Sequence, residues 1–424
     1  MSSENKENSE SNSKKKFFLK RKSRFKTVHP GIHVNGAMGN LVSIETDLGI
    51  VQVDTGNSNH MAKTILNGLR KLSNAPIHTI IYSHGHNSYN FGVEAFIKAA
   101  EERGEPRPQI VAHERLPLRY QRYQETAGLQ NYLGNIQFRF PPETKMKSTY
   151  VFPDVTFSDR LSLKMGNRTI ELLWAPSETD DSIAVWLPKE KVLYGGPAVI
   201  TTCINVGTPL RTLRDAVRWA ETLDNLKTLR PEILIPSYVS IIKGTDQIQA
   251  MLGNMAEGLR YLRREVVKRM NQHMTDVEIL HDITYPPEYF EQPWSNQIYG
   301  CPDWIVRDIY RSENGWWDRN PTNLHPARPD LAARAIFEAI SDPKKVLEKV
   351  RMLRDSNEIQ LALHVVDLLA LASGEESKIL EAKKLKSELL HLQAKEVPSI
   401  VSKNLYLSHA DNLDKVVQNA RKLG

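Results

Sequence analysis

The chain has 424 residues, of which 40% are hydrophobic and 25% are charged, so it can bury a sizeable core and is not disordered throughout. This length favours two domains. The two cysteines, Cys203 and Cys301, exclude a disulfide framework and a cysteine-rich zinc module, and they favour a reducing compartment. No apolar run reaches the roughly 18 residues of a membrane span, and the polar N-terminus is unlike a secretory signal.

The net charge of +6 is concentrated at the N-terminus. Residues 1–27 hold nine Lys or Arg and three Glu, so the rest of the chain is neutral and is not expected to bind nucleic acid. Their composition is typical of a disordered tail. Residues 14–26, KKKFFLKRKSRFK, suggest a nuclear-localisation signal read by the import machinery, an anionic-membrane patch, or a solubilising tail. The expected location is intracellular and cytoplasmic. A nuclear location is the alternative if residues 14–26 act as an import signal.

Strands and helices alternate along the first half of the chain, which favours α/β layering. Before residue 113, strands are expected at 41–45, 49–54, 78–82 and 109–112, and helices at 60–71 and 91–103. Residues 113–150 are rich in tyrosine, and an irregular segment is expected there. Strands return at 151–157, 168–174, 182–187 and 192–193, followed by a helix at 213–226 and a strand at 232–235.

From about residue 245 the pattern is mostly helical. The expected helices are 246–271, 304–311, 330–339, 343–355, 358–373 and 377–394. The stretch 284–329 is rich in Pro, Trp, Tyr and Asn. We therefore place a domain boundary near 285–300, with an α/β part before it and a helical part after it.

The residues most informative about chemistry follow a predicted strand. Residues 80–86, Ile-Ile-Tyr-Ser-His-Gly-His, put His84 and His86 at its end. Side chains two residues apart in an extended segment share a face, so both rings can reach one metal ion. Asp54 ends another strand upstream. A His-x-His pair by itself is a weak signal, and surface or core histidines are the alternative.

Longer motifs point to a family. Val53-Asp54-Thr55-Gly56, followed by Ser83-His84-Gly85-His86, resembles the start of a metallo-β-lactamase-fold hydrolase. The resemblance narrows to the alkyl sulfatase group of that fold through residues 112–115, 176–181, 234–237 and, above all, 314–326, Asn-Gly-Trp-Trp-Asp-Arg-Asn-Pro-Thr-Asn-Leu-His-Pro. It covers about residues 28–395.

This resemblance implies an α/β fold, an αββα metallo-β-lactamase sandwich followed by an all-helical dimerisation domain. The lipid-transfer-like C-terminal domain of the group is not expected here. The resulting division is a disordered basic tail at 1–27, a metallo-β-lactamase-like domain at 28–285, a helical dimerisation domain at 286–395 and a C-terminal extension at 396–424.

Members of this group hydrolyse esters at a pair of zinc ions, so the resemblance also implies ligands. The metal ligands that it implies here are His84, His86 and Glu178. The positions that hold the second ion are changed: Ser88 and Tyr89 replace Asp and His, Pro197 replaces a bridging carboxylate, and Tyr238 replaces the last His. Proline offers no side-chain ligand, so a dizinc site of the family type is not expected. The expected cofactor is one divalent ion, zinc or iron, because two His and one carboxylate suit both one-zinc hydrolases and non-haem Fe(II) oxygenases.

Three further residues are expected beside that ion. Asp54 orients a ligand histidine by accepting its other N–H, or it caps the strand end. Tyr89 and Tyr238 either bind substrate through their phenols or fill the space of the lost ligands. Both alternatives place the two tyrosines together beside His84 and His86.

The resemblance also suggests substrate contacts. Arg211 lies near the position of an arginine that binds sulfate in the family, and a helix-capping or solvent-facing role is the alternative. Trp304 stands where the family has an anion-binding His, and it suggests an apolar pocket wall or a domain interface. Asp181 substitutes for Glu178 as ligand if Glu178 points away, and otherwise it is a solvated loop acid.

Three functions are consistent with these residues. The first is an alkyl sulfatase-like hydrolase with a single-metal site, acting on a small amphipathic or anionic substrate. The second is a mononuclear non-haem Fe(II) oxygenase on the same ligands, and the third is a non-catalytic homodimeric binding or scaffold protein. The metal-binding hypotheses require His84, His86 and Glu178 to converge within about 4 Å of a common point. The resemblance implies a homodimer in each case.

Overall fold

The computed structural model describes residues 25–37, 39–141, 149–238 and 240–423. The basic tail lies outside the described residues up to position 24, and so does nearly all of the 14–26 segment. Strand β1 (Phe25–His29) includes residues 25–27, which the sequence analysis counted with that tail. No helix in the described ranges is both long and apolar enough to cross a membrane.

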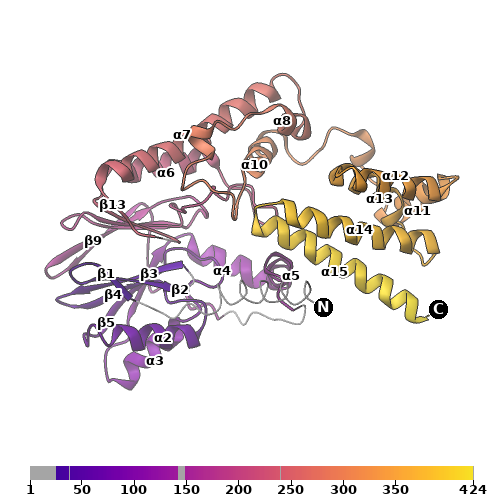
Figure 1. The fold of residues 1–424 in the computed structure, drawn as a ribbon. Helices are drawn as coiled ribbons and strands as arrows, with labels where there is room; N and C mark the ends of the chain where they lie inside the picture. The colour runs from indigo at the N-terminus through magenta and orange to yellow at the C-terminus, as the bar shows by residue number, and fades with distance from the viewer. Residues whose placement is uncertain (1–24, 38, 142–148, 239, 424) are drawn as a thin grey trace, which may run out of the picture.

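Two β-sheets face each other in the first part of the chain (Figure 1). The first sheet contains, in spatial order, β1, β2 (Ile32–Ala37), β3 (Gly39–Thr46), β4 (Gly49–Val53), β5 (Ile77–Ile81), β6 (Gln109–His113) and β7 (Val155–Phe157). Strands β1 to β4 pair antiparallel, and β4 to β7 pair parallel. Parallel pairing brings the carboxyl ends of β4 and β5 to the same edge of the sheet.

The second sheet follows in the chain. Its strands are β8 (Arg160–Met165), β9 (Arg168–Trp174), β10 (Ile183–Leu187), β11 (Val192–Gly196), β12 (Ile233–Pro236) and β13 (Ile242–Lys243), in spatial order β13-β12-β11-β10-β9-β8. Strands β11 and β12 pair parallel, and the other neighbours pair antiparallel. The sequence analysis missed β8, an edge strand in which only Met165 is buried.

Helices cover the outer faces of both sheets (Figure 1). α2 (Asn59–Leu69) and α3 (Val93–Glu102) pack on the first sheet, and α6 (Ala216–Thr228) and α7 (Thr245–Met270) pack on the second. The core between the sheets is aliphatic and draws on both of them, for example Val51 and Val53 from one and Leu172 and Val185 from the other. This is the predicted αββα sandwich.

The segment 113–150 corrects the sequence analysis. It was expected to be irregular, but it forms α4 (Leu116–Glu125) and α5 (Ala127–Phe138). The buried side of α4 carries Tyr120 and Tyr123, and the residues buried on α5 are Gly134 and Gln137. Together with the buried Leu116, the two tyrosines of α4 have the i, i+4, i+7 spacing of an apolar helix face, which the sequence analysis overlooked. The buried positions of α5 form no apolar stripe.

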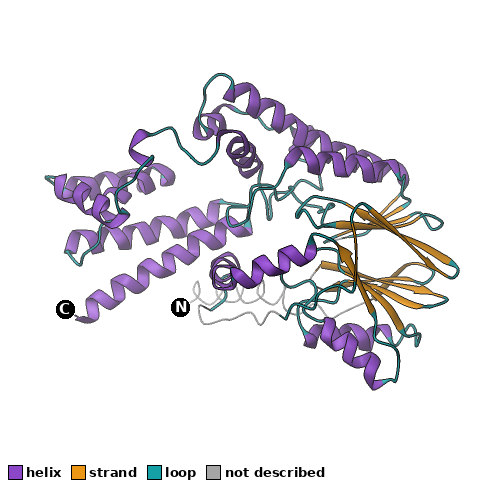
Figure 2. Cartoon of the chain, turned by 180° about the vertical axis from the view of Figure 1, so that it is seen from behind, coloured by secondary structure: helices purple, strands orange, loops and turns teal. Residues whose placement is uncertain are grey.

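The rest of the chain is helical. It comprises α8 (Asp276–Asp282), α9 (Pro287–Phe290), α10 (Pro302–Asn314), the 3₁₀ turn η1 (Pro321–Asn323), α11 (Pro329–Ala339), α12 (Pro343–Asp355), α13 (Ile359–Ala370), α14 (Ser377–Glu396) and α15 (Ile400–Leu423). Helices α12 to α15 share an apolar core of their own. Helices α11 to α13 lie at the end of the molecule far from the two sheets, and α14 and α15 run from there back towards the sandwich (Figure 1 and Figure 2).

Helix α15 makes up most of the segment treated as a C-terminal extension. Its Ala410 is buried and its carbonyl accepts a hydrogen bond from Ser387 Oγ of α14 at 3.4 Å. It also contacts α5, where Arg139 Nη2 lies 2.8 Å from Asp411 Oδ2. The last helix therefore ties the helical part back to the sandwich.

Candidate metal centre

Loops from both sheets converge at one edge of the sandwich. Asp54 follows β4 and the His84-Gly85-His86 segment follows β5, both in the first sheet. In the second sheet, Glu178 lies in the loop between β9 and β10, and Tyr238 follows β12. Four stretches that are far apart in the sequence thus supply side chains to one place.

The side chains of His84, His86 and Glu178 form one cluster. One ligand atom from each lies within 4.8 Å of the other two. Glu178 Oε2 lies 3.9 Å from His84 Nε2 and 3.6 Å from His86 Nδ1. Atoms so separated lie within about 3 Å of a common point, which meets the convergence required of a metal site.

The donor set fits a divalent cation. His84 Nε2 is buried and has no hydrogen-bond partner among the described residues. Leaving a buried polar atom unpaired costs about 1–3 kcal/mol, so an unpaired nitrogen that faces two other ligand atoms indicates room for a bound group. Two imidazoles and one carboxylate are ligands for Zn²⁺ or Fe²⁺.

Ser83 connects His84 to Asp54. Ser83 Oγ lies 2.6 Å from Asp54 Oδ2 and 2.9 Å from His84 Nδ1. The sequence analysis expected the carboxylate to accept directly from the ring, but the serine hydroxyl stands between them. Because the hydroxyl gives its proton to Asp54, it accepts from His84 Nδ1–H, and this network assigns the lone pair to Nε2, the atom that faces the centre.

Asp54 is a buried carboxylate with several donors. Besides Ser83 Oγ it accepts from the Ser83 backbone N–H at 2.8 Å, from Asn90 Nδ2 at 3.1 Å and from Tyr194 OH at 3.3 Å. Burial raises the pKa of Asp54 to about 6, although these hydrogen bonds lower it. The sequence analysis gave no role to Ser83, Asn90 or Tyr194, although Ser83 stands inside the quoted Ser83-His84-Gly85-His86 motif.

Glu178 is held in the ionised state. Burial alone would raise its pKa, but His86 and Arg214 lower it well below the ordinary value. The arginine beside Glu178 is therefore Arg214, which the sequence analysis did not single out. The predicted substrate contact, Arg211, is half-buried and donates to the Leu210 carbonyl at 2.9 Å.

Tyr89 and Tyr238 lie together beside the histidines, as both alternatives required. Their hydroxyl groups share a hydrogen bond. The Tyr89 ring packs on His84 with the ring centres 4.3 Å apart. Tyr89 and Pro197 are buried, whereas Tyr238 is half-buried, so of the two phenols Tyr238 is the more accessible.

Asp181 is not the solvated loop acid that was expected. It is fully buried, its Oδ1 accepts from Arg119 Nε at 2.5 Å, and its Oδ2 accepts from the Gly85 N–H at 2.6 Å. A Cβ on Gly85 would lie 3.0 Å from both partners. Asp181 and Arg119 therefore clamp the turn between the two histidines, which explains why glycine separates them.

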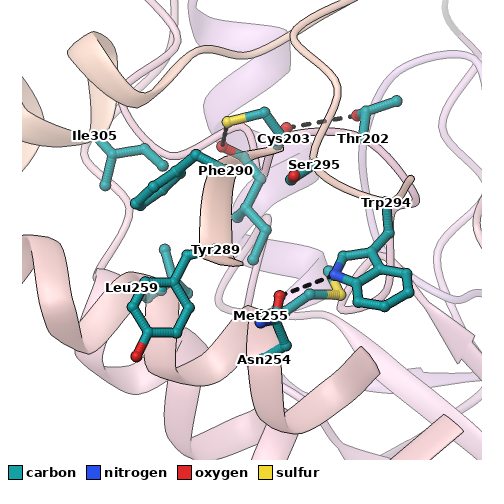
Figure 3. Close-up of a pocket in the computed structure, with 12 residues that line it drawn as sticks. Thr202, Cys203, Asn254, Met255, Leu259, Tyr289, Phe290, Trp294, Ser295 and Ile305 are labelled. Atoms are coloured by element: carbon teal, nitrogen blue, oxygen red, sulfur yellow. Dashed lines mark hydrogen bonds between the residues drawn. The ribbon is translucent and has the colours of Figure 1, made fainter. Parts of the chain in front are cut away.

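A mostly apolar pocket is lined by none of His84, His86 and Glu178 (Figure 3). Its walls come from α7, α9, the start of α10 and the loop after β11, with Leu259, Phe290, Ile305 and Cys203 among its lining residues. Trp294 Nε1 donates to Asn254 Oδ1 at 3.0 Å at its edge (Figure 3). Trp304, predicted as a pocket wall, is half-buried in α10 and is absent from this lining.

We expect acid to destabilise the metal-free protein through His84. Burial, and next the neighbouring His86, lowers the pKa of His84 from 6.5 to about 3. The unfolded chain binds a proton below pH 6.5 that the folded chain does not, so this contribution to stability is complete above 6.5 and is lost towards pH 3. Between pH 7.5 and 5 it is about 2 kcal/mol.

The measurement is urea unfolding in chelator at both pH values, for wild type and His84→Gln. The raised pKa of Asp54 changes the stability in the opposite direction, because the stability that protonated Asp54 contributes is lost as pH rises towards 6. Only the difference between the two proteins therefore isolates the effect of His84. The exposed His60→Gln is the matched control. Parallel pH profiles for wild type and His84→Gln would contradict the assignment.

The two sheets, their helices and the ligand-bearing edge define a protein of the metallo-β-lactamase fold. Residues 35–238 match the metallo-beta-lactamase superfamily, and residues 275–415 match the alkyl sulfatase dimerisation family. The chain thus combines a metallo-beta-lactamase domain with an alkyl sulfatase dimerisation domain, which supports an alkyl sulfatase-like family.

Similar proteins agree with this assignment. A linear primary-alkylsulfatase of Pseudomonas sp. (strain ATCC 19151) is 29% identical over 328 residues, which cover 72% of this chain and 61% of that protein. Alkyl/aryl-sulfatase BDS1 of Saccharomyces cerevisiae is 24% identical over 424 residues, covering 91% and 63%. The solved sec-alkylsulfatase Pisa1 from Pseudomonas sp. shares the fold, with a TM-score of 0.81 at 21% identity, over 92% of this chain and 65% of that chain. The chain spans about three fifths of the length of the curated relatives.

Proposed function

We propose that this protein is a metal-dependent hydrolase of alkyl sulfate esters with a single-metal centre on His84, His86 and Glu178. The observation that carries the proposal is the convergence of these three ligand atoms within 4.8 Å, with the buried Nε2 of His84 otherwise unpaired. The family resemblance places a second ion where Tyr89 and Tyr238 now pack against each other, which supports one ion rather than two.

A divalent ion bound there supplies a nucleophile from water at neutral pH and polarises an ester oxygen. The chain's own residues orient a metal ligand and offer a hydrogen-bond donor to the substrate. Asp54 and Ser83 hold His84 with its Nε2 lone pair inward. Tyr238, backed by the Tyr89 hydroxyl, offers a phenol as a hydrogen-bond donor to an oxygen of the bound ester.

The proposed substrate is an amphipathic sulfate monoester, because the relatives are named for alkyl sulfates. Arg211 is the proposed contact for the sulfate group. It is half-buried and lies three residues before Arg214, which contacts Glu178, and this supports a position near the centre. Trp304 is proposed to line the path of the apolar chain.

The proposed partner is a second copy of the chain. Support comes from the match of residues 275–415 to alkyl sulfatase dimerisation and from exposed apolar side chains on α11 and α13, among them Leu331, Ile336 and Leu368. Light scattering after gel filtration tests this, and a mass of one 48.3-kDa chain at all concentrations would reject it.

The deciding experiment is metal analysis of anaerobically purified protein, with His84→Ala/His86→Ala beside wild type. We expect about one zinc per wild-type chain, lost in the double variant, and sulfate release from dodecyl sulfate by wild type alone. Circular dichroism of both proteins controls for folding.

Other results would change the conclusion. One iron per chain would favour oxygen chemistry on the same three ligands. No metal in wild type would reject the proposed centre and favour a non-catalytic homodimeric relative. Two zinc ions per chain would contradict the single-metal proposal.

A further inference from the structure

The two oxygens of the Glu178 carboxylate have different partners. Oε2 faces His84 Nε2 at 3.9 Å and His86 Nδ1 at 3.6 Å. Oε1 accepts from Asn205 Nδ2 at 2.7 Å and from Arg214 Nη2 at 3.3 Å. Asn205 and Arg214 therefore hold the carboxylate through Oε1, the oxygen that does not face the histidines.

We propose that Arg214 and Asn205 are positioning residues that fix Glu178 as a one-oxygen metal ligand, an inference that rests on the single-metal centre proposed above. Both residues are buried. A buried guanidinium is costly unless it is paired, and here its partners are Glu178 and the Asn205 backbone carbonyl. Arg211, three residues earlier, makes no such contact with Glu178 and instead donates to Leu210.

The helical part of the chain fixes the loop that carries Asn205 and Arg214. The Arg214 N–H donates to Asp308 Oδ2 of α10 at 2.9 Å. Gly207 of the same loop has φ +73°, and a Cβ there would lie 1.9 Å from the Trp304 carbonyl oxygen, also of α10. The loop is thus pressed against α10 at two points, so the position of the guanidinium is set by a rigid element rather than by the loop alone.

The chemical consequence concerns open coordination positions. A carboxylate whose second oxygen is already hydrogen-bonded offers one donor atom, and two imidazoles add two more. This leaves room on the ion for water and a substrate oxygen. Without Asn205 and Arg214, the carboxylate can turn about its last torsion, and Oε2 is no longer directed at the centre.

The test uses Zn²⁺ affinity, measured by competition with a chromophoric chelator, and the visible absorption of the Co²⁺-loaded protein. Arg214→Met and Asn205→Ala should each weaken Zn²⁺ binding by about 10–100-fold and alter the Co²⁺ bands, as is usual for residues that orient a ligand. Arg214→Lys, which keeps the charge but loses the planar fork, should give an intermediate loss. Exposed Arg218→Met on α6 is the matched control.

The outcomes separate this inference from the proposed function. If wild type binds one Zn²⁺ and both variants bind it equally tightly with unchanged Co²⁺ bands, the positioning role is rejected and the metal centre stands. If wild type binds no metal, both proposals fall. Should Arg214→Met not fold, Asn205→Ala decides alone, because it removes one amide and leaves the Arg214–Glu178 contact in place.

Discussion

Replacing Glu178 by glutamine is expected to weaken Zn²⁺ binding by more than about 100-fold, beyond the loss typical of residues that only orient a ligand. The neutral amide lacks the charge that a divalent ion requires of its oxygen ligand. The same change leaves the buried guanidinium of Arg214, 3.3 Å away, without its counter-charge. Breaking a buried pair in this way costs about 3–5 kcal/mol, so the variant should also be less stable.

The double variant Glu178→Gln/Arg214→Met separates the two effects. It removes the uncompensated cation, so most of the lost stability should return, while Zn²⁺ binding stays as weak as in Glu178→Gln. Urea unfolding in chelator and chelator competition are the two measurements. Arg214→Met alone completes the cycle, and a double variant whose loss of stability equals the sum of the two single losses would show that the two side chains are not coupled.

Glu190→Gln provides a matched control. Glu190 also pairs with an arginine, Arg168, at 2.7 Å, the two side chains are 7% and 11% exposed, and neither belongs to the metal cluster. Its replacement should destabilise the fold by a similar amount and leave Zn²⁺ affinity unchanged. If Glu178→Gln bound Zn²⁺ as well as Glu190→Gln, Glu178 would not be a ligand.

The sandwich was predictable because its core elements have simple periodicity. The central strands β5, β10 and β11 are short runs in which most side chains are buried, and α2 buries Ala62, Ile65, Leu66 and Leu69 at helical spacing. Helix α5 lacks such a pattern, since it is held by polar contacts with distant segments. Gln137 Nε2 donates to Tyr299 OH at 2.6 Å, and Asn404 Nδ2 donates to the Gln137 carbonyl at 2.8 Å.

The candidate site also contains some residues that the sequence predicted and others that it did not. The proposed ligands are in motifs, so the family resemblance predicted them, and the structure brings their side chains together. Of the residues that orient them, Ser83 stands in a motif and Arg214 does not. Ser83 reaches His84 across one peptide, and Arg214 reaches Glu178 across 36 residues of sequence. Only the folded loop distinguishes Arg214 from Arg211, because both are arginines in the same stretch.

Replacing Asp54 by asparagine is expected to weaken Zn²⁺ binding by about 10–100-fold although no ligand is changed. In wild type, Ser83 Oγ donates to Asp54 and accepts from His84 Nδ1–H. An amide nitrogen at this position would instead donate to Ser83, which would then turn its proton towards Nδ1. A neutral imidazole carries only one N–H proton. That proton would move from Nδ1 to Nε2, where it would occupy the lone pair that faces the centre.

The measurement is the ¹⁵N chemical shift pattern of the His84 ring in metal-free protein, which reports the tautomer, together with Zn²⁺ competition. Wild type should be protonated at Nδ1 and Asp54→Asn at Nε2. An unchanged tautomer with unchanged affinity would refute the relay through Ser83. An unchanged tautomer with weakened affinity would locate the defect in the carboxylate's charge instead.

Asp54→Ala distinguishes the relay from simple support of the fold. It leaves Asn90 Nδ2, Tyr194 OH and the Ser83 N–H as buried donors without this acceptor, at about 1–3 kcal/mol each. The same variant also removes a buried negative charge, whose cost is reflected in the raised pKa of Asp54, about 6. At pH 7 this gain offsets about 3 kcal/mol of the lost stability, and it becomes smaller as pH falls below 6. Asp54→Ala should therefore be destabilised more at pH 5 than at pH 7. Asp54→Asn should keep most of its stability and still bind Zn²⁺ weakly, a combination that a purely structural role for Asp54 does not produce.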